Sequence, residues 1–197
     1  KEGMEVSEEE EEEEGEEEVE YDEHVWLSLK NAQVVCTEIA SALSSIDEKN
    51  ADTYKENAEK YNENLAGLDE KYTEATTAAK QKTLLFGDRF PFRYLVEDYG
   101  LDYYAAFIGC SAETEASFET IQFLAEKTDE LNLKTVLTLK HSDNKIAETI
   151  ISNTQSKDQE IKSLDSMQST TSEDVEKGAA YLKIMEDNLE VLKQVID

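Results

Sequence analysis

TLLFGDRFPFRYLVEDYGLDYYAAFIG, residues 83–109, contains two short apolar runs on either side of a helix-like segment. The first run, residues 83–87, ends at Gly87 and is typical of a buried strand. Residues 92–99 predict a helix that stops at Gly100, a residue type that often follows the last turn of a helix. Residues 103–109 predict the next strand. A strand, a helix and a second strand in this order favour two parallel strands of one sheet.

The same alternation continues toward the C-terminus. It predicts a helix over 117–131, a strand over 135–139, a helix over 144–153, a strand over 160–164 and an amphipathic helix over 175–195. We therefore expect an α/β fold with a four-stranded, mainly parallel sheet flanked by helices. In such sheets ligands bind beyond the carboxyl ends of the strands.

Upstream, the apolar spacing changes to that of helices. Residues 28–46 carry apolar side chains at spacings of four, four and three, which predict one face of a helix. A second helix begins near Asn50 or Asp52, and its stripe is more typical of packing on a core than of a coiled coil: Tyr54, Ala58, Tyr61, Leu65, Leu68 and Tyr72. We divide the chain into an acidic loop or tail over 1–20, an interlobe segment with long hinge helices over 21–80, and an α/β metal-binding lobe over 81–197.

The charge is strongly negative. The 197 residues have a formal net charge of −28, and residues 1–23 alone carry 15 acidic side chains and one Lys. Such a balance argues against nucleic acid, because phosphate binding needs clustered Lys and Arg. The acidic run is interpreted as a spacer or as a loop that collects cations through many weak carboxylate contacts.

Cysteines and hydropathy set further bounds. Cys36 and Cys110 can pair in an oxidising compartment or remain two thiols, and the sequence leaves both open. No stretch approaches the eighteen apolar residues of a membrane span, and no signal peptide is visible, so we interpret the chain as a piece of a longer protein.

Three side chains stand out as metal-ligand candidates. His24 follows two carboxylates and precedes the only Trp, so it can be a ligand or a structural histidine. Asp88 follows the Gly that ends the first strand, where it can face a cleft or pair with Arg89. Asp165 follows the fourth strand, where Asp is also common as a helix cap. His141 ends the third strand and is interpreted as a surface residue. No nucleophile elbow, P-loop or dinucleotide motif is present, so we expect no enzyme.

Several motifs resemble the solute-binding proteins that deliver zinc or manganese to ABC-type importers. The similar segments are residues 21–32 (YDEHVWLSLKNA), 92–95 (FRYL) with 99–101 (YGL) and 115–117 (EAS), and 164–166 (LDS) with 181–189 (YLKIMEDNL). They cover about residues 20–197 in the family's order. The resemblance implies two α/β lobes joined by a rigid helix, with the metal between them and the first lobe outside this chain.

The resemblance also implies a ligand set. His24 matches the family's second ligand and Asp165 the fourth, while the third position falls on Arg89, so Asp88 is taken as its replacement. The implied cargo is zinc, with manganese as the alternative. The implied protein is a monomer that meets a membrane permease on the extracellular face or in the periplasm, where it is secreted or lipid-anchored. A surface adhesin on the same fold is the competing interpretation.

Overall fold

The computed structural model describes residues 22–108 and 116–197. Its elements, in chain order, are η1 (Val25–Leu27), α2 (Leu29–Ile46), η2 (Glu48–Asn50), α3 (Ala51–Ala78), β1 (Thr83–Phe90), α4 (Arg93–Asp98), β2 (Asp102–Ile108), α5 (Phe118–Glu130), β3 (Thr135–Leu139), α6 (Lys145–Asn153), β4 (Glu160–Leu164), α7 (Ser172–Glu176) and α8 (Tyr181–Ile196). The acidic run and Cys110 lie outside the described residues, while Cys36 on α2 is a half-buried free thiol.

The four strands form one parallel sheet in the order β2-β1-β3-β4. The predicted α/β fold, with long helices before the sheet, is therefore confirmed. Successive side chains of a strand point to opposite faces, so a sheet covered on both sides needs continuous apolar runs. Residues 84–86 are such a run, and all three side chains are at most 1% exposed.

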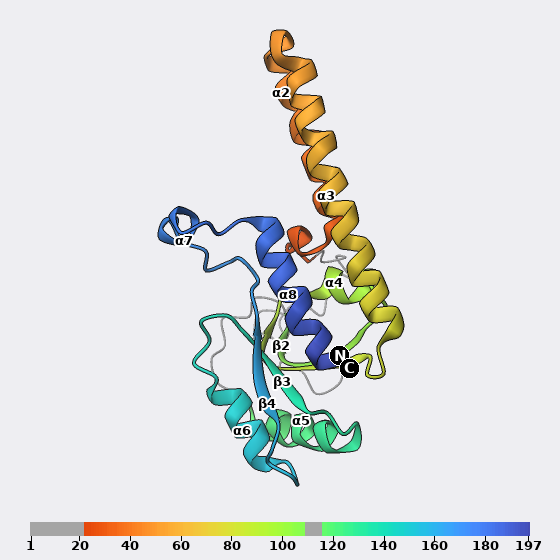
Figure 1. Ribbon diagram of the computed structural model, residues 1–197. Coiled ribbons are helices and arrows are strands. Elements are labelled where there is room, and N and C mark those ends of the chain that lie inside the picture. Colours follow the sequence, from red (N-terminus) through yellow and green to blue (C-terminus); the bar gives the residue numbers. More distant parts are fainter. Residues whose placement is uncertain (1–21, 109–115) are drawn as a thin grey trace, which may run out of the picture.

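Two apolar cores lie on the two faces of this sheet. Leu84 and Phe86 of β1 pack with the lower part of α3 and with α8, whereas Leu85 packs with α5 and α6. Figure 1 shows α3 and α8 on one side of the sheet and α5 and α6 at the other. Gly87 permits the close approach of α6, because a Cβ there would lie 2.6 Å from the Cα of Ala147.

Helices α2 and α3 form a hairpin that projects away from the sheet (Figure 1). The lower part of α3 fits the prediction of core packing, since Leu65, Leu68 and Tyr72 are at most 2% exposed. The upper part does not contact the core, and Tyr61 is 37% exposed. The apolar stripe of α2 is exposed as well: Val35, Ile39, Leu43 and Ile46. Periodicity identified these helices without showing that much of their length leaves the lobe.

Two boundaries differ from those expected. Strand β1 continues to Phe90, so Asp88 and Arg89 lie within it, at a register irregularity against β2 between Phe86 and Arg89. The final helix is interrupted, because α7 ends at Glu176 and Gly178 adopts a positive φ of 96° before α8 begins. A positive φ is incompatible with a continuing right-handed helix.

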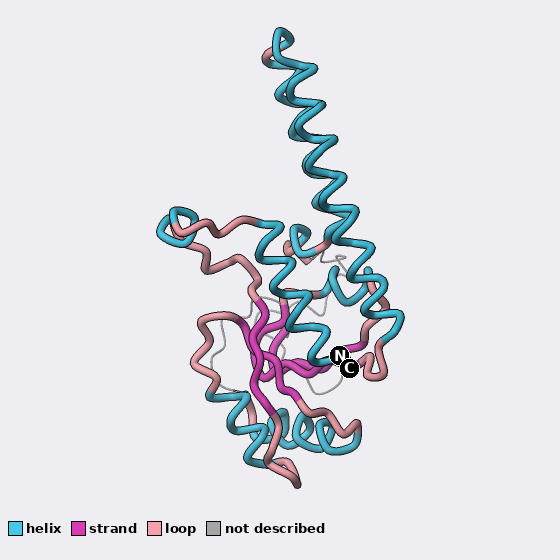
Figure 2. The backbone as a smooth tube through the Cα atoms, in the orientation of Figure 1, coloured by secondary structure: helices cyan, strands magenta, loops and turns pink. Residues whose placement is uncertain are grey.

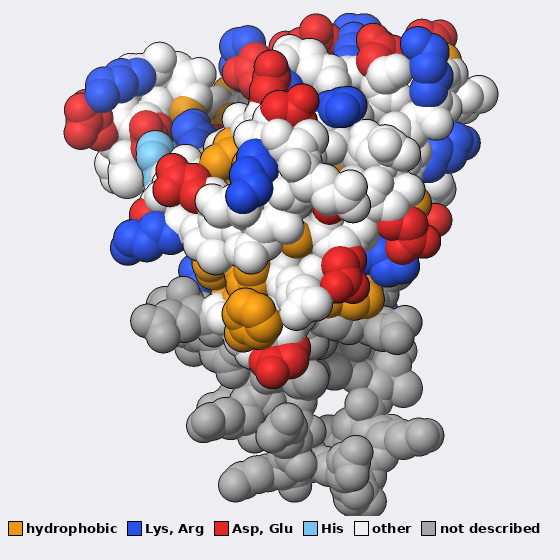
Figure 3. All heavy atoms as spheres, turned by 90° about the horizontal axis from the view of Figure 1, so that it is seen from below, with side chains coloured by type: hydrophobic (Ala, Val, Ile, Leu, Met, Phe, Trp, Pro, Cys, Tyr) orange, Lys and Arg blue, Asp and Glu red, His pale blue; other side chains and the backbone are white. Residues whose placement is uncertain are grey.

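The face opposite the hairpin carries acidic and basic side chains intermixed, with apolar side chains between them (Figure 3). The negative excess is therefore not gathered into one field on that face. Among the described residues, no helix combines the length and apolar character that a membrane crossing requires.

Candidate metal site

His24 is fully buried and lies directly before η1. Its Nδ1 is 2.7 Å from Oδ1 of Asp22, and the same oxygen accepts the His24 backbone N–H at 2.9 Å. Tyr94 of α4 donates its hydroxyl to the Asp22 carbonyl at 2.8 Å, which fixes this segment against the lobe. An ionised carboxylate can only accept, so Nδ1 carries the proton and Nε2 presents a lone pair.

The lone pair of Nε2 faces polar side chains. The amide Nε2 of Gln168 lies 3.2 Å from it, and Oε1 of Glu23 lies 4.0 Å away. Asp22, Glu23 and His24 form the one group of three or more metal-ligating side chains within 4.8 Å of one another in residues 22–108 and 116–197. A carboxylate on Nδ1, which leaves Nε2 as the acceptor atom, is the arrangement of a metal-ligating histidine.

Trp26 joins this segment to the loop after β4. Its indole N–H donates to the Ser166 carbonyl at 3.0 Å, and its own carbonyl accepts the Tyr181 hydroxyl at 2.7 Å. The Trp26 ring lies 5.3 Å from the His24 ring. Residues 140 positions apart in sequence are therefore held side by side, and the loop that begins at Asp165 is brought to His24.

Asp165 begins that loop and is held rigidly. Asn188 of α8, which is 3% exposed, accepts the Asp165 backbone N–H at 2.8 Å and donates to its carbonyl at 2.9 Å. The carboxylate Oδ1 accepts the Met167 N–H at 2.8 Å, and Oδ2 accepts from Nζ of Lys140 at 2.8 Å. This bond to Asp165 is the main cause that raises the pKa of Lys140, so the amine is charged at neutral pH.

Asp88 is buried at the same edge of the sheet. Its Oδ1 accepts the Arg89 N–H at 2.8 Å, and its Oδ2 accepts the Leu139 N–H at 3.0 Å. Asp88 therefore links the irregular end of β1 to the end of β3. Each carboxylate oxygen keeps a further lone pair for a ligand.

The three predicted residues thus lie around the carboxyl edge of the sheet and the loop that faces His24. Leu139, bonded to Asp88, precedes Lys140, whose N–H donates to the Leu164 carbonyl and whose side chain reaches Asp165. The carboxylates of Asp88 and Asp165 are not part of the compact group around His24. His141 is exposed with a positive φ of 70°, as a surface residue would be.

Sequence reasoning did not single out Glu23, Gln168 or Asn188. Glu23 is adjacent to His24, and Asn188 belongs to the YLKIMEDNL motif, so both carried a signal. Gln168 carried none, because its role depends on a contact across 144 positions of sequence. Lys140 follows the third strand, but its contact with Asp165, 25 positions away, was not predicted.

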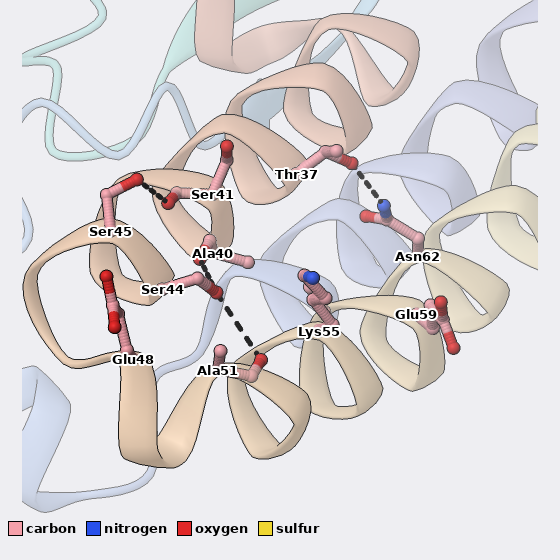
Figure 4. A pocket seen from close by; sticks show the side chains of 11 residues that line it. Thr37, Ala40, Ser41, Ser44, Ser45, Glu48, Ala51, Lys55, Glu59 and Asn62 are labelled. Atoms are coloured by element: carbon pink, nitrogen blue, oxygen red, sulfur yellow. Dashed lines mark hydrogen bonds between the residues drawn. The ribbon is translucent and has the colours of Figure 1, made fainter.

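One hollow among the described residues lies away from this site. A space of about 690 Å³ opens between α2 and α3, and small or polar side chains from both helices line it, among them Ala40, Ser44, Ala51 and Asn62 (Figure 4). Asn62 donates to Oγ1 of Thr37 across the hairpin at 2.9 Å. This hollow contains none of the predicted ligands.

Comparison with known families identifies one match along nearly the whole chain. Residues 1–195 match the family model described as zinc-uptake complex component A, periplasmic (ZnuA). The zinc-binding lipoprotein AdcA of Streptococcus pneumoniae is 35% identical over 180 residues, which are 90% of this chain and 34% of AdcA. The high-affinity zinc uptake system protein ZnuA of Bacillus subtilis is 31% identical over 172 residues, which are 87% of this chain and 52% of that protein.

Solved structures give the same result. The Zn(II)-bound ZnuA-like domain of S. pneumoniae AdcA superposes with a TM-score of 0.73 at 31% identity, over 90% of this chain and 64% of that chain. The laminin-binding protein Lmb of Streptococcus agalactiae, described as a bifunctional protein with adhesin and metal transporting activity, gives a TM-score of 0.77 at 28% identity, over 90% and 65%. This chain spans about a third to a half of these curated relatives.

Proposed function

Because the chain belongs to the periplasmic zinc-uptake component A family, whose members are transport proteins and not enzymes, we propose that it is the metal-capturing C-terminal part of an extracytoplasmic receptor for an ABC-type zinc importer. The observation that carries this proposal is the buried His24, with Nδ1 fixed by Asp22 and Nε2 facing the loop after β4. Residues 81–197 are the metal-binding lobe, and residues 21–80 are the segment that links it to the rest of the receptor.

The proposed ligands are His24, Asp165 and Asp88. His24 supplies a neutral imidazole whose lone pair is already oriented. Asp165 supplies a carboxylate on a backbone that Asn188 holds from a buried position. Asp88 supplies a carboxylate from β1, tied to two backbone N–H groups. Glu23 is a further oxygen donor, 68% exposed, near Nε2 of His24.

Zinc is the proposed cargo, and manganese is the alternative. An imidazole with carboxylates suits both ions, but a mixed nitrogen and oxygen site binds zinc more tightly than manganese in the Irving–Williams order. The two zinc-named relatives and the Zn(II)-bound structure support the same choice. We expect weak zinc binding by this chain, because ligands from one lobe leave coordination positions to water.

The test is to titrate the chain with zinc and to measure binding by isothermal titration calorimetry and by competition with a chromogenic chelator. We expect a dissociation constant in the micromolar range or weaker, and at least about tenfold weaker binding for His24→Ala and for Asp165→Asn. Manganese should compete poorly. The matched control is His141→Ala, which removes an exposed imidazole outside the site.

Two results would contradict parts of this proposal. If the His24→Ala variant still binds zinc with nanomolar affinity, the zinc site does not include His24. Asp88→Asn tests whether Asp88 is a zinc ligand or only a structural link between β1 and β3. The variant should lose the link, because an amide cannot accept both backbone N–H groups. If this variant melts at a lower temperature but binds zinc as before, Asp88 is a structural link and not a ligand.

The partners follow from the proposed role. The receptor would act as a monomer outside the cytoplasmic membrane, secreted or lipid-anchored, and deliver zinc to the importer's permease. A surface adhesin is the second candidate, favoured by the likeness to Lmb. Immobilised laminin separates them: zinc binding without laminin binding supports the receptor, and laminin binding that survives His24→Ala supports adhesion.

A further inference from the structure

Two of the proposed ligand atoms, on His24 and Asp165, already have an N–H donor from a side chain. The Gln168 amide lies at Nε2 of His24, and the Lys140 ammonium lies at Oδ2 of Asp165. Of the two, Lys140 carries a full positive charge and therefore competes directly with a metal ion. We propose that Lys140 is a built-in counter-ion, which neutralises Asp165 in the metal-free protein and is displaced when the metal binds. This inference rests on the proposed function.

In Asp165, Oδ2 is the oxygen whose partner can leave, because that partner is a side chain and not a backbone N–H. Its backbone is bonded on both sides by Asn188, and Oδ1 is bonded to the Met167 N–H. Rotating the carboxylate away would break the bond to Met167. The carboxylate is only 12% exposed, so water compensates its charge poorly, and Lys140 supplies the compensation at Oδ2.

Lys140 is built to leave without unfolding its surroundings. Its backbone N–H donates to the Leu164 carbonyl, which keeps the end of β3 paired with β4 when the side chain moves. The side chain is 48% exposed, so its stem can turn into solvent. The carboxylates of Asp174 and Asp187 also act on its charge, so Asp165 is not the only acidic group that favours the charged amine.

The proposal predicts two effects of opposite sign. Without Lys140, Asp165 stays uncompensated in the metal-free protein, which should be less stable. The metal then meets a free carboxylate and no competing cation, so it should bind more tightly. A residue with a merely structural role would weaken both stability and binding.

The experiment compares Lys140→Gln with the unchanged chain. We expect zinc affinity, measured by chelator competition at low salt, to rise about two- to fivefold. We expect the melting temperature without metal to fall by about 1–3 °C. Lys140→Arg keeps the positive charge, so this variant should bind zinc about as weakly as the unchanged chain. Lys193→Gln is the matched control, because it removes the same charge from an exposed pair with Glu190 on α8.

The outcomes separate this inference from the proposed function. If Lys140→Gln leaves zinc affinity unchanged or lowers it, the proposal that Lys140 is a counter-ion is wrong. This holds even if His24→Ala abolishes zinc binding, as the proposed function requires. The same holds if Lys193→Gln tightens binding equally, because the effect would then come from net charge alone. Absence of zinc binding by the unchanged chain and by Lys140→Gln would overturn both proposals.

Discussion

At the scale of single residues, the site depends on how neighbours prepare a side chain. An isolated imidazole exchanges between two tautomers, whereas the carboxylate of Asp22, 2.7 Å from Nδ1, selects the one with its lone pair on Nε2. The same carboxylate accepts the His24 backbone N–H, so ring and backbone are fixed by one acidic residue. His24 and Asp22 together, rather than His24 alone, make the proposed ligand.

Asp22→Asn tests this dependence. The amide keeps the shape of the side chain but is a weaker acceptor, so the imidazole loses basicity and orientation. We expect zinc affinity to fall about tenfold, with an unchanged circular dichroism spectrum. Asp143→Asn is the matched control, since Asp143 is an exposed carboxylate that pairs with Lys145 and is not part of the proposed site. Equal affinity of Asp22→Asn and the unchanged chain would show that the tautomer is set by other contacts.

At the scale of elements, packing distances decide what the hydrophobic pattern cannot. Gly87 interrupts an apolar run, and the sequence suggested only that a strand ends there. In the structure β1 continues, and Gly87 is the point where α6 contacts the sheet. Gly67 lies in the middle of α3, and nothing lies within 4 Å of a Cβ placed there.

These two glycines should respond in opposite directions to the same substitution. Gly87→Ala forces α6 away from β1 and should lower the free energy of unfolding by about 1–3 kcal/mol. Gly67→Ala removes backbone freedom from a helix interior and should raise it by about 0.5–1 kcal/mol. Urea denaturation measures both. A stabilised Gly87→Ala would mean that α6 does not approach the sheet as described.

The hairpin of α2 and α3 shows a second limit at this scale. The stripe of α2 has the period of a core-facing helix, yet Ile39 is 55% and Ile46 84% exposed. The face that α2 turns toward α3 carries small and polar residues such as Ala40 and Ser44. Periodicity reveals that a helix has two faces, and it does not reveal what each face contacts.

At the scale of the whole molecule, charge acts over longer distances than any contact. Residues 7–20 contain eleven Glu, and the complete chain has a formal net charge of −28. Such a field attracts divalent cations and raises their concentration near the protein, and salt screens it. Figure 2 shows the strands of the sheet below the hairpin and the loops that connect them to the helices.

Deleting residues 7–20 should therefore slow zinc association at low ionic strength and leave dissociation unchanged. The difference should disappear at about 0.5 M salt, where the Debye length is only a few ångströms. Stopped-flow measurement with a zinc indicator provides both rates. Replacing the eleven Glu with Gln is the control for chain length. Identical association rates at low salt would exclude a collecting role for the acidic run.

The sequence by itself determined the succession of strands and helices along the chain and the parallel sheet, because these follow from local periodicity. It also determined the family, because contiguous motifs carry that resemblance. It also nominated His24, Asp88 and Asp165. Only the tertiary structure placed Asp88 inside β1 and bonded to Leu139, and only it set Gln168 against His24 and Lys140 against Asp165. The physical reason is that such contacts join residues 25 to 144 positions apart, and no local pattern encodes which of them meet.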